Sequence, residues 1–148
     1  METRWPIRLL TALLLVLGLS GIGIGLAVLV DPVGAGIGLG PEWLEGSPFS
    51  DHRIPGLVAM VILGALPLSV VGLVVRRSPW AWSASLMVGL VLMAWLYVEI
   101  LVIGYHPRPP LQAIYGLLGV AVVALTLHPA VRRGLGERDQ GPGDAREG

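Results

Sequence analysis

A single acidic side chain, Glu99, stands inside the long hydrophobic segments of this chain. It lies near the end of the segment that begins at Trp80 and ends at Ile103. An ionised carboxyl group is costly to place in hydrocarbon, so an acid within a membrane-crossing helix commonly pairs with another group or belongs to a functional site. Glu99 is therefore the first candidate functional residue.

Polar side chains from the neighbouring segments could meet Glu99. The acid stands five residues before Gly104, which places it roughly 7–8 Å inside the end of its helix. If successive helices alternate in direction, the ends of all four hydrophobic segments on this side lie at one level. We therefore expect a polar cluster around Glu99, whose further members are Arg53, Gln112 and Tyr115, with His52, His106 and Arg108 nearer the surface.

Three interpretations of this cluster stay open from the sequence. In the first, Glu99 pairs with Arg53 or accepts hydrogen bonds from Tyr115 and Gln112, and so fixes the register of the helices. In the second, the cluster is a small-molecule, lipid-headgroup or proton-handling site, in which a desolvated Glu99 exchanges protons. The third is hydrolytic or metal-dependent catalysis.

Catalysis has little support in the sequence. Neither an H-E-x-x-H nor a G-x-S-x-G motif occurs, so we predict no catalytic residue and no metal ligand. His52 and His106 could in principle bind a haem or a metal ion, but lone histidines at a membrane surface are usually solvated. We therefore expect no cofactor. The sequence favours a structural or accessory subunit, or scaffold, of the cytoplasmic membrane, with the Glu99 site as the alternative.

The composition indicates a membrane protein. Of the 148 residues, 54% are hydrophobic and 14% are charged, whereas a soluble domain carries about a quarter charged residues. The chain has no cysteine, which excludes disulfides, thiolate catalysis and lipidation at cysteine. All ten basic residues are arginine, and no run of them resembles a nucleic-acid-binding surface, so no nucleic-acid partner is expected.

Four apolar segments are long enough to cross a bilayer. The sequence therefore predicts an all-α membrane protein, an antiparallel bundle of four transmembrane helices at about residues 9–30, 55–75, 80–103 and 110–127. The transmembrane domain covers residues 1–133, and the tail 134–148 is expected to be disordered. A cleaved signal peptide is the rival interpretation of the first segment, but its apolar run exceeds the usual length of about 7–15 residues.

The connection 31–54 is predicted to be the longest outer loop. Residues 41–45 predict one helical turn at the membrane surface, with Trp43 at headgroup depth. The loop could lie on the bilayer and cap the bundle, or it could act as a lid over a ligand.

Small residues three or four positions apart predict close helix packing. These residues are Gly21, Gly25, Ser85, Gly89, Gly116 and Gly119. The glycine-rich first helix could use this face inside the bundle, in a homo-oligomer, or against a larger membrane complex. In the second segment, Pro67 is expected to kink or locally open the helix.

Several strings resemble an uncharacterised family of small bacterial four-span integral membrane proteins. The strings are Asp31-Pro32, Trp43-Leu44-Glu45-Gly46-Ser47-Pro48-Phe49-Ser50-Asp51, Ile54-Pro55-Gly56-Leu57, Val98-Glu99-Ile100 and Leu111-Gln112-Ala113-Ile114-Tyr115-Gly116. The resemblance covers the chain from the loop after the first helix to the fourth helix. It implies the fold class and a location in the bacterial inner membrane, and it implies no activity.

The distribution of arginine predicts the orientation. With the amino terminus inside, eight arginines would lie in the cytoplasm, while only Arg53 and Arg108 would lie outside. The positive-inside rule therefore places both termini in the cytoplasm. A reporter that is active only in the cytoplasm should be active when it is fused after Arg77 and inactive when it is fused after Arg53. Activity in the opposite pattern would contradict this orientation.

Overall fold

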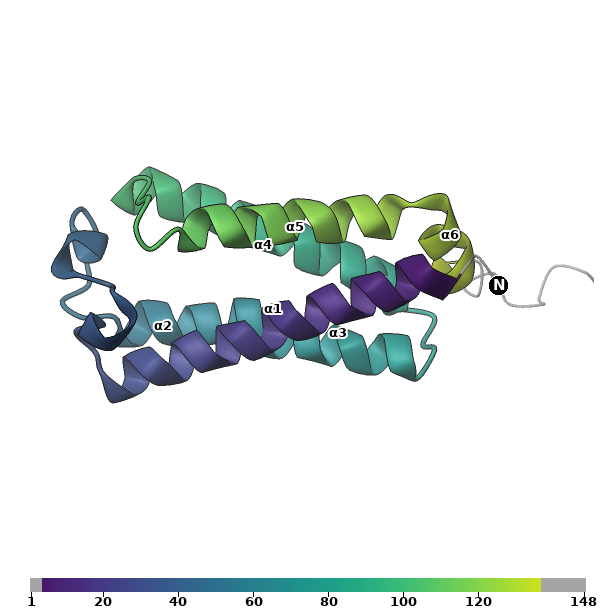
Figure 1. The fold of residues 1–148 in the computed structure, drawn as a ribbon, viewed down its shortest axis with the longest axis horizontal. Helices are drawn as coiled ribbons and strands as arrows, with labels where there is room; N and C mark the ends of the chain where they lie inside the picture. The colour runs from purple at the N-terminus through teal and green to yellow at the C-terminus, as the bar shows by residue number, and fades with distance from the viewer. Residues whose placement is uncertain (1–3, 137–148) are drawn as a thin grey trace, which may run out of the picture.

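The computed structural model describes residues 4–136, and all regular structure in this range is helical (Figure 1). Three continuous helical rods are long and apolar enough to cross a membrane. They are α1 (Trp5–Val30), a second rod made of α2 (Arg53–Ala59), η4 (Met60–Ala65) and α3 (Leu66–Val75), and α4 (Ala81–Ile103). These rods are consistent with a helical membrane protein.

A fourth candidate span is bent. The helix α5 (Leu111–Leu127) is followed by α6 (Pro129–Val131) and the short π-helix η5 (Arg132–Gly136), at an angle of 59° to α5. The predicted disordered tail begins too early, because residues 134–136 belong to η5 and Leu135 is buried in the main core. The remainder of that tail, 137–148, lies outside the described residues.

The rods lie side by side along the long axis of the molecule, and successive rods run in opposite directions (Figure 1). We call the end that carries the connections 31–52 and 104–110 the loop end. Its charged residues are Asp31, Glu42, Glu45, Asp51, Arg53 and Arg108. We call the opposite end the arginine end. Within residues 4–136 its charged residues are Arg4, Arg8, Arg76, Arg77, Arg132 and Arg133.

Helix α1 and the π-helix η4 touch backbone to backbone. A Cβ atom at Gly21 would lie 2.5 Å from the carbonyl oxygen of Leu63, and a Cβ atom at Gly64 would lie 2.9 Å from the backbone nitrogen of Ile22. Gly25 faces the side chain of Met60 in the same way. This glycine face of α1 is therefore occupied within the chain.

The π-helix η4 lies directly before Pro67. Proline has no N–H to donate to the carbonyl of Leu63, four residues earlier, and its ring crowds that carbonyl. A π-helical turn, with its wider hydrogen-bonded ring, accommodates such a position. The helix thus opens locally where α1 makes its closest approach, and Ser69 Oγ donates to the Ala65 carbonyl at 2.8 Å.

Helices α4 and α5 form a second close pair through small residues. Gly89 faces Val123, and Gly119 faces Leu92 and Met93. Gly116 lies opposite Leu96 with more room, while Ser85 bonds to the Ala81 carbonyl of its own helix. The α4–α5 pair and the pair of α1 with the second rod converge at the arginine end and diverge toward the loop end (Figure 1).

The backbone contact at Gly21 gives a test of this packing. Gly21→Ala should lower the free energy of unfolding by about 1–3 kcal/mol, because the added methyl group overlaps the Leu63 peptide. Gly23→Ala on the same helix is the matched control, since no atom lies within 4 Å of its added Cβ. Alanine's higher helix propensity should make that variant equal to or up to about 1 kcal/mol more stable than the wild type.

The two variants should be compared by thermal unfolding in one detergent. Equal melting temperatures for Gly21→Ala and Gly23→Ala would show that α1 does not rest on η4 as described.

Candidate functional site

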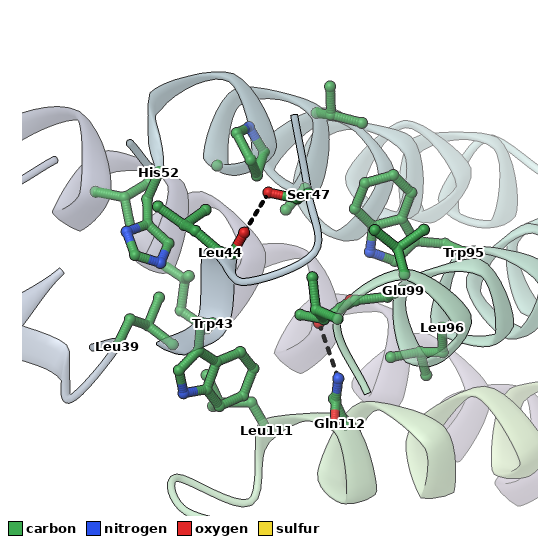
Figure 2. A pocket seen from close by; sticks show the side chains of 18 of the residues that line it. Leu39, Trp43, Leu44, Ser47, His52, Trp95, Leu96, Glu99, Leu111 and Gln112 are labelled. Carbon is green, nitrogen blue, oxygen red and sulfur yellow. Dashed lines mark hydrogen bonds between the residues drawn. The ribbon is translucent and has the colours of Figure 1, made fainter. Parts of the chain in front are cut away.

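A cavity of about 320 Å³ lies at the loop end, where the two helix pairs diverge (Figure 2). Its volume is at the lower end of the range of roughly 300–1,000 Å³ that small-molecule sites occupy. Every long helical rod contributes to its wall, and the connection 31–52 covers it. Its members from the helices include Ile24, Val28, Val58, Ala59, Leu63, Trp95, Leu96, Val98, Glu99, Val102, Leu111, Gln112 and Tyr115.

The wall of the cavity reaches the surface of the molecule on α2 and α4, and at Phe49 of the covering loop. Val58 on α2 and Val98 and Val102 on α4 line the cavity and are also exposed on the surface of the molecule. Leu63 and Leu96, deeper along the same two rods, are buried and close its floor. If these helices cross a bilayer, this exposed part of the wall would face lipid chains.

Trp43 holds the covering loop in place. This residue belongs to η3 (Pro41–Leu44), is 5% exposed, and packs in a small core with Val28 and Leu39. Its ring stacks on that of His106, with the ring centroids 4.7 Å apart. The predicted helical turn is present as η3, but Trp43 is buried, because its ring packs against this core and the His106 ring instead of lying at the surface.

Gln112 ties the end of α4 to the start of α5. Its Oε1 accepts the backbone N–H of His106 at 2.8 Å, and its Nε2 donates to the Gly104 carbonyl at 3.1 Å. The same Nε2 lies 3.4 Å from Glu99 Oε1, near the limit for a hydrogen bond (Figure 2). Gln112 therefore mainly holds the connection 104–110, and Glu99 is only weakly bonded to it.

The predicted partner Arg53 does not reach Glu99. In the described part of the chain, the polar groups around the Glu99 carboxyl group are those of Gln112, Trp95 and His106. Arg53 is exposed at the start of α2, which belongs to the other helix pair than Glu99. The Glu99–Arg53 pair, one of the alternatives that the sequence left open, is not formed among the described residues, and Arg108 is likewise exposed in the connection 104–110.

Tyr115 bonds to a different helix from the one predicted. Its hydroxyl group donates to Ser20 Oγ on α1 at 3.0 Å. The ring still lines the cavity, because α5 directs this face toward α1. The predicted hydrogen bond from Tyr115 to Glu99 is therefore replaced by a link between α1 and α5.

His52 is a buried member of the cavity wall, with 6% of its surface exposed. Its Nδ1 lies 3.2 Å from the Pro32 carbonyl oxygen, which can only accept, so Nδ1 carries the proton of this hydrogen bond. In the neutral imidazole, Nε2 is then an acceptor, and it has no partner among the described residues. The sequence placed His52 above the cluster because it gave no sign of the loop that buries it.

Two aromatic side chains of the wall, Trp43 and Phe49, were not expected there from the sequence. Trp95, Phe49 and Trp43 line the cavity together with Tyr115. Trp95 stands one turn before Glu99 on the same helix face, as their spacing of four residues indicates. Phe49 and Trp43 depend on the fold of the loop, which no periodic pattern records.

The residues of the site are of the kinds that bind small molecules. Within residues 4–136, no three histidine or acidic side chains are close enough to hold a metal ion. The wall presents an apolar surface with a few polar groups at one side, the arrangement that fixes the orientation of a bound small molecule. Comparisons with protein-family models, with curated proteins and with solved structures find no match.

The geometry separates the roles of Gln112 and Glu99. Gln112→Leu should lower the free energy of unfolding by about 1–3 kcal/mol, because the His106 N–H and the Gly104 carbonyl lose their partner. Glu99→Gln should cost less than about 1 kcal/mol, because it removes only a long hydrogen bond. Thermal unfolding in detergent measures both. An equal or larger loss for Glu99→Gln would support the structural interpretation of the acid.

Proposed function

We propose that this protein is a four-span protein of the cytoplasmic membrane that binds a small lipid-like molecule in the cavity around Glu99. One observation carries the proposal: among the described residues, the lining of this apolar cavity includes one carboxyl group and no arginine. The apolar body of the ligand would contact Val58, Ala59 and Leu96. Its polar end would bind at Glu99 and Gln112. The function is binding, without catalysis by the protein.

The charge distribution supports the proposed orientation. The six arginines of the arginine end have no acidic residue beside them within residues 4–136, whereas the loop end carries four acidic residues. The positive-inside rule then favours both termini in the cytoplasm and the cavity in the outer leaflet. The fourth span of this proposal is α5 with its bent continuation, and the inner-membrane location follows the resemblance to bacterial four-span proteins.

A structural or accessory subunit is the alternative. It would bury a surface against a second copy of the chain or a larger membrane complex. The glycines Gly21 and Gly25, which could have supplied that surface, are already covered by η4. The hydrogen bond between Gln112 and Glu99 is long, so this acid contributes little to the stability of the fold. The cavity therefore favours a binding function over a scaffold.

Filling the cavity tests the proposal. Ala59 lines the cavity, so Ala59→Phe should occupy part of its volume and displace the ligand. Ala124→Phe is the matched control, because Ala124 is an exposed alanine of α5 outside the cavity wall. Native mass spectrometry of protein extracted gently from membranes should show a bound small molecule on the wild type and on Ala124→Phe.

The same spectrum of Ala59→Phe should lack that adduct or show it at a small fraction of its abundance. An adduct of equal abundance on Ala59→Phe and Ala124→Phe would place the bound molecule outside the cavity. If the wild type carries no adduct, the proposal fails.

A further inference from the structure

The described side chains that line the cavity include an acid and no strong base. Of the described residues that line it, none is arginine or lysine, and Glu99 is the one carboxylic acid. His106 lies near this acid, but its ring stacks on Trp43 and makes no hydrogen bond to the carboxyl group. A bound cation would stabilise the ionised form of such a carboxyl group and offset the cost of placing its charge in an apolar site, because little water remains there to screen the attraction.

Two acceptor groups of the wall favour the same kind of ligand, whereas Trp43 Nε1, a wall atom that is also buried without a partner within residues 4–136, is a donor. The Glu99 carboxyl group has a hydrogen bond of 3.4 Å from Gln112 Nε2 and the Trp95 side chain as a further neighbouring donor, and its two oxygens can still accept more hydrogen bonds. The Nε2 atom of His52 is an acceptor in the neutral ring and has no partner within residues 4–136. Two wall residues thus offer acceptors, and a ligand with a positive charge or N–H donors would complement them.

Aromatic rings add to this preference. Trp95, Tyr115 and Phe49 line the cavity on different elements. The face of an aromatic ring carries partial negative charge and attracts cations, most strongly in tryptophan. A cation near Glu99 would therefore lie close to a carboxyl group and to the ring of Trp95, one turn away on α4.

The cation must also carry an apolar body. A small metal ion would lose its water shell in this cavity, and the described residues supply no group of three ligands to replace it. An organic cation with a bulky hydrocarbon body can instead bury that body against the aliphatic wall and arrive through the opening between Val58 and Val98. We propose that the cavity binds a lipophilic organic cation, with its charge at Glu99. This inference rests on the proposed function, because it names the class of ligand that the cavity takes.

Two hydrophobic ions of one shape test the charge preference. Tetraphenylphosphonium and tetraphenylborate both carry four phenyl groups and have opposite charges. Each is dialysed to equilibrium against the full chain in phosphatidylcholine nanodiscs, and binding to empty nanodiscs is subtracted. The wild type should bind the cation at least roughly tenfold more tightly than the anion. Glu99→Asp should keep this preference, and Glu99→Gln should lose it.

The controls distinguish failure of this inference from failure of the proposed function. If Ala59→Phe abolishes cation binding and Glu99→Gln leaves it unchanged, the cavity binds ligands but the role of Glu99 is overturned. If the wild type binds neither ion above empty nanodiscs, or prefers the anion, the cation inference is overturned, while the adduct seen by native mass spectrometry still decides the proposed function. If Glu99→Gln does not fold, the result rests on Ala59→Phe, which must lose cation binding, and Ala124→Phe, which must keep it.

Discussion

The backbone contact between α1 and η4 is the constraint on which the rest of the structure depends. Glycine stands on both sides of it, at Gly21 and Gly64, so the two helices approach more closely than side chains would permit. Helices α4 and α5 form their own close pair through Gly89 and Gly119. Each pair is fixed internally, and the two pairs meet through larger side chains toward the arginine end. The cavity at the loop end is a consequence of this pairing.

The free energy needed to keep such a cavity open differs between water and a membrane. In water an apolar cavity that opens to the surface would be wetted or would collapse, but lipid chains can fill a lateral opening without loss of hydrocarbon contact. The loop end is closed by the stack of Trp43 on His106 and by the hydrogen bonds of Gln112. The Gln112 side chain satisfies the backbone N–H of His106 and the carbonyl of Gly104.

The sequence predicted the helices well and the site only in part. Apolar segments of bilayer length predict the long helices, and the spacing of Gly21 and Gly25 predicts a close-packed face. Glu99 and Gln112 were expected together, and they lie together, because both stand near the same ends of neighbouring helices. Other contacts depend on the path of the loops, which no periodicity encodes: the burial of Trp43 and His52, and the separation of Arg53 from Glu99.

The central claim is that a molecule from the bilayer can enter the cavity between α2 and α4. Trp43 reports on it most directly, because this ring lines the cavity and is only 5% exposed. The measurement is fluorescence quenching in bilayers of lipids brominated on their acyl chains, with Trp43 kept as the one tryptophan. We expect strong quenching that Ala59→Phe reduces and Ala124→Phe leaves unchanged. Absence of quenching, or equal quenching in all three proteins, would contradict a cavity that is open to the membrane.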